Sequence, residues 1–225
     1  MLYLGWVLLV SCLPLVLLAA PQGPGLSALA WRIGLFHGAG LLCSVALISA
    51  EGLWPRWRAL LARPARGLLL AIALYLLPAA LVTLFLLPLP GPLPVWARAM
   101  LLPFDFGWLL LGHIPPLSAR WLSGKLLLAA GSAAEEWIFR CALWLRWAGP
   151  FPERGTAARC RLPHLYKLFA LSLYFSLLHF QHGAQVMAQA LAGSLLLGAL
   201  LMWRRNFTLI ATLHVLFNWG ALRTL

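Results

Sequence analysis

Two adjacent glutamates lie in the middle of an apolar segment, GSAAEEWIFRCALW. Glu136 precedes Arg140 by four residues, a spacing that places both side chains on one face of a helix, where they can form an ion pair. Glu135 is rotated by about 100° from its neighbour and is left without that partner. A purely structural ion pair therefore explains Glu136 and Arg140 but not Glu135, and a functional role for the glutamate pair is favoured.

Two later apolar segments carry polar side chains at helical spacing. In LYFSLLHFQHG, His179 follows Phe175 by four residues and His182 follows His179 by three. In NFTLIATLHVLFNWGAL, His214 and Asn218 lie one turn apart on one face. A carboxylate beside a neutral imidazole can deprotonate a water molecule, and an imidazole N–H together with an amide can stabilise an oxyanion. These are the parts of a hydrolase that uses water directly.

The composition predicts that these segments lie in a membrane. Of the 225 residues, 63% are hydrophobic and 10% are charged, whereas a soluble domain has about 25% charged residues. The mean hydropathy is +0.88. Such a chain cannot cover itself with polar surface in water, which excludes a soluble globular enzyme, a disordered chain and a disulfide-linked secreted module. The formal net charge of +12 is ascribed to membrane topology and not to nucleic-acid binding.

We expect an all-α polytopic helix bundle, a single integral membrane domain over residues 1–225 with about seven transmembrane helices. Three spans are expected within 1–94, and the catalytic helices within 120–222. The segment near 95–121 contains Asp105 and internal prolines, so it is expected to be interfacial or re-entrant; a further spanning helix there is the alternative. The expected spans are residues 1–20, 33–49, 67–89, 124–147, 168–180, 184–203 and 207–222.

The basic residues alternate with the expected spans as the positive-inside rule predicts. Basic segments follow the second, fourth and sixth spans, and with a cytoplasmic N-terminus all of them face the cytoplasm. They contain Arg56, Arg58, Arg63 and Arg66; Arg146, Arg154, Arg159, Arg161 and Lys167; and Arg204 and Arg205. We therefore expect a multi-pass protein of a prokaryotic cytoplasmic (inner) membrane, surrounded by the lipid bilayer and without a nucleic-acid partner. His37, His113 and His164, outside the motifs, are interpreted as surface or interfacial residues.

Together the three motifs resemble those of the CPBP intramembrane proteases, which include the type II CAAX-prenyl endopeptidases and their bacterial Abi-like relatives. The resemblance covers about residues 120–222 and implies hydrolysis of a peptide bond within the membrane by a glutamate-activated water molecule. It implies a membrane-associated protein as the substrate, cleaved near its C-terminus or in a membrane segment. The motifs are EExxxR at Glu135, Glu136 and Arg140, FxxxH at Phe175 and His179, and HxxxN at His214 and Asn218, in this order.

The resemblance also implies a role for each motif residue. Glu135 is the general base and acts with His179 on the water molecule, while His214 and Asn218 stabilise the oxyanion. Some relatives act on prenylated CAAX proteins, some process the C-terminal sorting tails of other proteins, and some act in bacteriocin self-immunity. The sequence does not choose among these functions. The supporting residues are the ion pair Glu136 and Arg140, with Phe175 and His182.

Three other interpretations stay open. The first is a zinc ion held by Glu135, His179 and His214, because two histidines and a glutamate serve catalytic zinc. A site without any cofactor is favoured, and zinc is the alternative, since the chain has no HExxH motif and the glutamate mechanism needs no metal. The second is a catalytically silent membrane adaptor or immunity protein that keeps the polar cluster for folding or binding. The third is a small transporter with a proton relay, although the chain shows no internal repeat.

Overall fold

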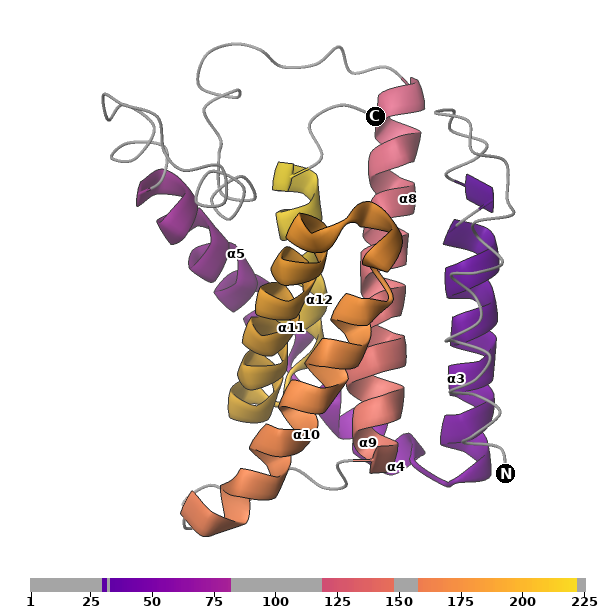
Figure 1. Cartoon of the computed structure of the whole chain (residues 1–225), viewed down its shortest axis with the longest axis vertical. Helices are drawn as coiled ribbons and strands as arrows, with labels where there is room; N and C mark the ends of the chain where they lie inside the picture. The colour runs from indigo at the N-terminus through magenta and orange to yellow at the C-terminus, as the bar shows by residue number, and fades with distance from the viewer. Residues whose placement is uncertain (1–29, 32, 82–118, 148–157, 222–225) are drawn as a thin grey trace.

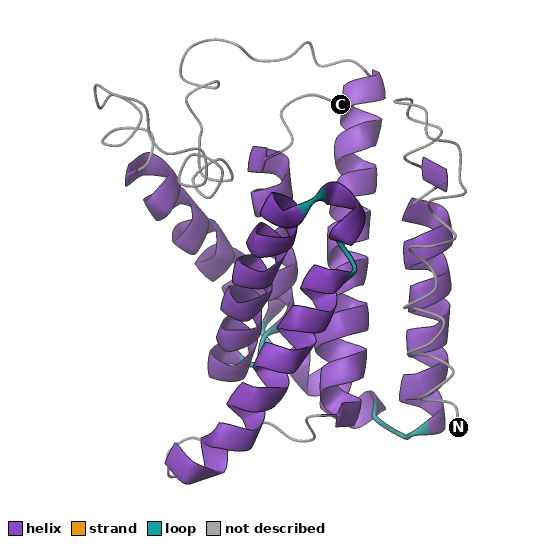
Figure 2. Cartoon of the chain, in the orientation of Figure 1, coloured by secondary structure: helices purple, strands orange, loops and turns teal. Residues whose placement is uncertain are grey.

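The structure is a computed structural model that describes residues 30–31, 33–81, 119–147 and 158–221. Within these ranges every regular element is a helix, so the expected all-α class is confirmed for the described part of the chain (Figure 2). The elements η1 and η4 are π-helical and η5 is a 3₁₀-helix. In chain order the elements are η1 (Ile33–His37), α3 (Gly38–Ala50), α4 (Trp54–Leu60), α5 (Pro64–Leu81), α8 (Ala119–Glu135), η4 (Glu136–Ala142), α9 (Leu143–Trp147), α10 (Ala158–Leu177), η5 (Phe180–His182), α11 (Ala184–Arg204) and α12 (Phe207–Ala221).

Helix α12 packs against several of the other helices. It packs against α5, α8, α11 and η4, while α10 packs against α11 and α3 packs against η4. Figure 1 shows α8, α10, α11 and α12 grouped together, with α3 beside α8 and α5 leaning away on the opposite side. The polar motifs lie on α8 and η4, at the end of α10 and on α12, so packed helices bring them to one region.

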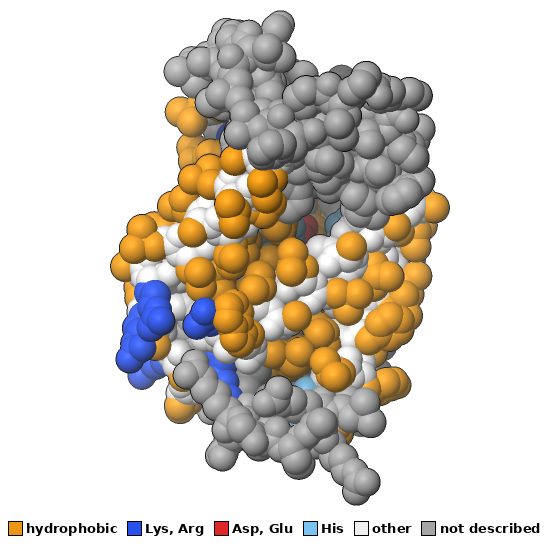
Figure 3. All heavy atoms as spheres, turned by 90° about the vertical axis from the view of Figure 1, so that its left-hand side faces the viewer, with side chains coloured by type: hydrophobic (Ala, Val, Ile, Leu, Met, Phe, Trp, Pro, Cys, Tyr) orange, Lys and Arg blue, Asp and Glu red, His pale blue; other side chains and the backbone are white. Residues whose placement is uncertain are grey.

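Buried side chains form two clusters in the described residues. One includes Tyr75, Leu201 and Leu213, where α5, α11 and α12 meet. The other includes Phe139 and Phe175, where η4 and α10 meet. Much of the remaining surface is hydrophobic, as Figure 3 shows for one face. Such a surface is suited to lipid and not to water, which agrees with a membrane protein.

Two helices, α5 and α11, are long and apolar enough to cross a membrane. The segments Gly34–Ala50 and Trp54–Leu60 add a third only if they count as one span, because the chain bends by 120° between them. Helix α12 contains a shorter apolar stretch, Phe207–Trp219. The described residues therefore contain two or three spans by length and composition, and the seven expected spans are not confirmed.

The apolar stretches nevertheless predict several helix boundaries closely. The expected spans 184–203 and 207–222 correspond to α11 and α12, and 33–49 corresponds to η1 with α3. Over the expected span 124–147, α8, η4 and α9 follow one another without a break. The first expected span and Asp105 lie outside the described residues.

Two segments that were expected to be basic loops are helical. The first contains α4, and the second contains the start of α10 at Ala158. In α4 the burial of apolar side chains outweighs the charge pattern: Leu60 is buried, and the ring centroid of Trp57 lies 4.3 Å from that of Trp137. A proline in the first turn of α4 is also compatible with a helix start, where its missing N–H has no partner to lose.

Asn206 fixes the start of α12 against the corner between α4 and α5. Its side-chain oxygen accepts a hydrogen bond of 3.0 Å from the backbone N–H of Leu209, which caps α12. Its amide donates to the backbone carbonyls of Ala62 and Arg63, at 3.1 and 3.2 Å. Gly67 of α5 leaves room for this side chain, because a Cβ atom at that position would overlap it. This corner thus positions the helix that carries the HxxxN motif.

The hairpin between α10 and α11 relies on two glycines. Gly183 directly precedes α11 and has φ +86°, a conformation that residues with a side chain rarely adopt. Gly198 of α11 lets the two helices approach, because a Cβ atom there would overlap the Leu168 side chain. The close approach holds α10 beside α11, and His179 follows two residues after the end of α10.

Candidate active site

The two glutamates lie where helix α8 changes into a π-helical segment. Glu135 is the last residue of α8, and Glu136 is the first residue of η4, which ends at Ala142. Short π-helical segments within α-helices are rare and occur frequently at functional sites. The two neighbouring side chains have different partners.

Glu136 is fully buried and accepts two short hydrogen bonds. Its Oε1 atom lies 2.6 Å from Nη1 of Arg140 and 2.6 Å from Nδ1 of His214. The ion pair predicted from the spacing of Glu136 and Arg140 is therefore present. The Arg140 guanidinium also lies 4.8 Å from the ring centroid of Phe175, a cation–π contact. Glu136 thus links η4 to α12, and Arg140 links η4 to α10.

Glu135 has different surroundings. Its Oε1 atom lies 3.0 Å from Nε2 of His37, and its Oε2 atom lies 3.6 Å from Nε2 of His214. The Glu135 side chain is 17% exposed, whereas that of Glu136 is 0% exposed. Glu135 is therefore the glutamate that water or a substrate can reach.

His179 lies two residues beyond the end of α10. Its Nδ1 atom is 2.9 Å from the backbone carbonyl oxygen of Phe175. Because a carbonyl oxygen only accepts, Nδ1 carries the proton in this hydrogen bond, and Nε2 of the neutral ring is left as an acceptor. The Phe175 ring supports the imidazole, with centroids 4.7 Å apart. The FxxxH spacing thus fixes the tautomer that a base at Nε2 requires.

Asn218 lies one helical turn beyond His214 on α12. Its amide donates a 2.8 Å hydrogen bond to Oγ of Ser132, and that hydroxyl donates to the carbonyl of Leu128 at 2.8 Å. An amide has two N–H groups, so this bond leaves the second for another acceptor. The neighbouring residue Trp219 also donates its ring N–H to the carbonyl of Lys125, at 3.2 Å. These contacts hold the end of α12 against α8.

A cavity of about 330 Å³ lies between the motif residues and α11. Helix α11 supplies much of its wall, largely with small and apolar side chains. Figure 3 shows acidic and histidine side-chain atoms in a hollow beside hydrophobic ones. A few converging polar groups in a largely apolar wall are typical of a ligand-binding site. The motif residues that border the cavity are Glu135, Arg140, Phe175, His179, His214 and Asn218.

The segment that carries all three motifs matches a known family. The family model described as type II CAAX prenyl endopeptidase Rce1-like matches residues 116–220. We call this segment the Rce1-like domain, after the family that it matches. The expected resemblance to the CPBP proteases is thereby confirmed, and the family implies a peptide hydrolase. No curated protein and no solved structure matches the chain.

One residue outside the Rce1-like domain also contacts Glu135. The interpretation of His37 as a surface or interfacial histidine is wrong, because its side chain is 13% exposed and contacts Glu135. The two residues are 98 positions apart, so no local motif connects them. The signal in the sequence that could have indicated this contact is the position of His37 within the expected span 33–49.

His182 lies at the periphery of the Rce1-like site. It is the last residue of η5, it is exposed, and it is not among the residues that border the cavity. Its ring centroid is 6.3 Å from that of His179. His164 is half-buried in α10, and His113 lies outside the described residues.

The zinc alternative requires Glu135, His179 and His214 around one ion. Among the described residues, no group of three or more His, Cys, Asp and Glu side chains is placed to hold a metal ion. Nδ1 of His214 is bonded to Glu136, and Nδ1 of His179 is bonded to a backbone carbonyl. These bonds leave Nε2 of each ring, the arrangement that zinc-binding histidines usually have, so the zinc interpretation stays an alternative prediction.

Proposed function

We propose that the protein is an intramembrane endopeptidase in which Glu135 activates a water molecule to hydrolyse a peptide bond. The observation that carries this proposal is the cavity, where an acid on α8, an imidazole at the end of α10, and an imidazole and an amide on α12 converge. The Rce1-like match supports the same class of reaction.

Glu135 and His179 act together on the water molecule. The carboxylate accepts one water proton, while Nε2 of His179 accepts a hydrogen bond from the other and orients the water oxygen. A bond forms between this oxygen and the carbonyl carbon as the proton moves to Glu135. When the C–N bond breaks, Glu135 returns the proton to the leaving amine, and the carboxylate is regenerated.

His214 and Asn218 stabilise the negative charge that develops on the carbonyl oxygen. Because Nδ1 of His214 donates to Glu136, donation from Nε2 requires a proton on both ring nitrogens. Carboxylate oxygens lie near both nitrogens, Oε1 of Glu136 at 2.6 Å from Nδ1 and Oε2 of Glu135 at 3.6 Å from Nε2. Asn218 contributes the N–H that its bond to Ser132 leaves over. The ion pair of Glu136 with Arg140 holds the imidazole in place.

The α11 side of the cavity suits an apolar peptide segment of a membrane-associated protein. Helix α11 is long and apolar enough to cross a membrane, and it borders the cavity with Ala190, Ala192 and Gly193. Small residues let another backbone approach a membrane helix closely. The substrate therefore enters from the lipid and is cleaved near its C-terminus or in a membrane segment.

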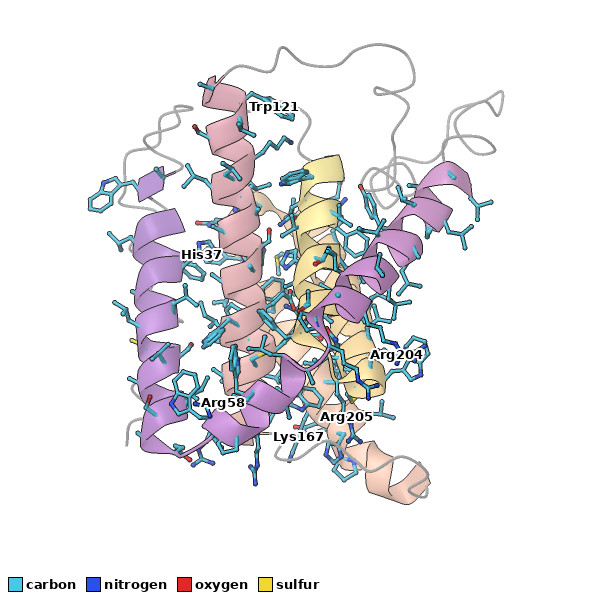
Figure 4. All side chains as sticks on the ribbon, turned by 180° about the vertical axis from the view of Figure 1, so that it is seen from behind. His37, Arg58, Trp121, Lys167, Arg204 and Arg205 are labelled. Carbon is cyan, nitrogen blue, oxygen red and sulfur yellow. The ribbon has the colours of Figure 1, made fainter. Side chains whose placement is uncertain are left out.

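The basic residues support one orientation in the membrane. Figure 4 shows Arg58, Lys167, Arg204 and Arg205 toward one end of the helices and Trp121 at the other. By the positive-inside rule the basic end faces the cytoplasm. Helix α3 ends at this side (Figure 1), so one span before it would place the N-terminus in the cytoplasm as well.

The test compares the N- and C-terminal peptides of membrane proteins from host cells that carry the wild-type chain or Glu135→Gln at equal expression. Glutamine keeps the shape of the side chain and removes the base. We expect new termini only with the wild-type chain, and these termini identify the substrates and the cleaved bonds.

Glu51→Gln is the matched control. It removes an acid whose 2.7 Å ion pair with Arg146 is largely exposed and which does not border the cavity, so it should give the wild-type termini. Identical termini in wild-type and Glu135→Gln cells, with both chains folded, would exclude the glutamate mechanism and favour the silent adaptor.

A further inference from the structure

We propose that His37 is a positioning residue, which donates a hydrogen bond from Nε2 to Oε1 of Glu135 and thereby directs Oε2 toward the reacting water. The inference rests on the function proposed above for Glu135. His37 lies on η1, outside the segment 116–220 that matches the family. The N-terminal part of the chain thus contributes directly to the site.

The contact is enclosed on both sides. Element η1 packs against α8, and the side chains of His37 and Glu135 are 13% and 17% exposed. The buried ring of Phe36 meets the His37 ring edge-on, with centroids 5.0 Å apart. Gly131, one turn before Glu135, leaves room for the imidazole, since a Cβ atom there would lie 3.3 Å from Cε1 of His37. The ring is therefore held between Phe36 and the backbone of α8.

The surroundings select the tautomer with its proton on Nε2. Nδ1 of His37 is buried and has no hydrogen-bond partner among the described residues. A proton on Nδ1 would be buried and unpaired, which is costlier than an unpaired lone pair at that atom. A proton on Nε2 instead gives the Glu135 carboxylate a donor at 3.0 Å.

This hydrogen bond separates the tasks of the two Glu135 oxygens. Oε1 contacts His37, and Oε2 lies on the side of His214, which borders the cavity. The last torsion of a glutamate has no sharp preference of its own, so a fixed donor is needed to hold the carboxylate plane. Loss of that donor should lower the rate of the chemical step and leave substrate binding nearly unchanged.

Solid-state ¹⁵N NMR of the histidine-labelled full chain in lipid bilayers tests the contact without a substrate. His37→Gln assigns the ring signals by their absence. We expect a neutral His37 with the proton on Nε2, and ring signals that shift in Glu135→Gln but not in Glu51→Gln. A proton on Nδ1, or ring signals that Glu135→Gln leaves in place, would overturn the proposal.

His37→Gln and His37→Asn are matched variants for a kinetic test. The amide nitrogen of glutamine reaches the position of Nε2, whereas that of asparagine reaches only the position of Nδ1. The probe is a quenched fluorogenic peptide with the sequence of a cleavage site found by the comparison of termini. We expect His37→Asn to lower kcat about 10- to 100-fold with KM changed less than about twofold, and His37→Gln to retain most of kcat.

A double variant separates a positioning role from a general loss of structure. In the Glu135→Gln chain, His37→Asn should cause no further loss of kcat, because both residues act through one carboxylate. Wild-type kcat in His37→Asn, or a loss that glutamine does not restore and that accompanies a lower Tm, would contradict the positioning role. Full cleavage by Glu135→Gln alone would instead refute the proposed function, while the NMR measurement still decides the contact.

Discussion

Two neighbouring glutamates differ in what surrounds them, and this difference assigns their tasks. Glu136 is enclosed by Arg140 and His214 at 2.6 Å each, which suits a structural anchor. Glu135 is partly exposed and borders the cavity, which suits a group that exchanges protons with water. Substitution of Glu136 should therefore mainly affect stability, and substitution of Glu135 should mainly affect activity.

Glu136→Gln should destabilise the protein strongly, and Glu135→Gln should not. Removing one partner of a buried ion pair costs about 3–5 kcal/mol, and Glu136→Gln leaves the buried Arg140 guanidinium without its counter-charge. The measurement is Tm by thermal unfolding in detergent, with the two glutamine variants compared side by side. Equal Tm values in both would show that the ion pair is not an anchor.

His179→Asn should keep the fold and lose the reaction. The asparagine amide can still donate to the carbonyl of Phe175, as Nδ1 does at 2.9 Å, but nothing replaces Nε2. Loss of a positioned acid or base lowers a rate by about 10²- to 10⁴-fold. Cleavage rates and circular dichroism of the purified variant check both statements. Near-wild-type cleavage would remove His179 from the proposed reaction.

At the scale of the elements, the corner between α4 and α5 holds α12 in place through Asn206. Gly67→Ala should destabilise this corner by about 1–3 kcal/mol through overpacking, although alanine is the better helix former. Gly34→Ala is the control, because nothing lies within 4 Å of a Cβ atom there. Thermal unfolding should show a lower Tm for Gly67→Ala only. A higher Tm would mean that the Asn206 side chain can move away at little cost.

The sequence predicts elements where local pattern decides and fails where distant contacts decide. Apolar runs of sufficient length mark α11 and α12 to within a residue or two, and helical spacing marks the ion pair of Glu136 with Arg140. Helix α4 was not predicted, because its helical form depends on packing against residues such as Trp137. The contact of His37 with Glu135 was missed for the same reason.

At the scale of the whole molecule, the uneven distribution of positive charge gives a prediction about orientation. Single cysteines at Arg58 and Arg205, in a chain whose four native cysteines are replaced, should react with an impermeant thiol reagent only from the cytoplasmic side. A cysteine at Trp121, toward the other end (Figure 4), should react only from the opposite side. Labelling of right-side-out and inverted vesicles measures this. The reverse pattern would invert the proposed orientation.

The place of His37 against Gly131 also has an evolutionary consequence. The two residues lie on different helices, and a Cβ atom gained at position 131 would lie only 3.3 Å from Cε1 of the imidazole, so a side chain there would press against the ring. Among homologous chains, a glycine at position 131 and a hydrogen-bond donor at position 37 should therefore be inherited together or lost together. A chimera that takes its N-terminal helices from one relative and the rest of its chain from another should cleave substrate only when position 37 carries such a donor and position 131 is glycine.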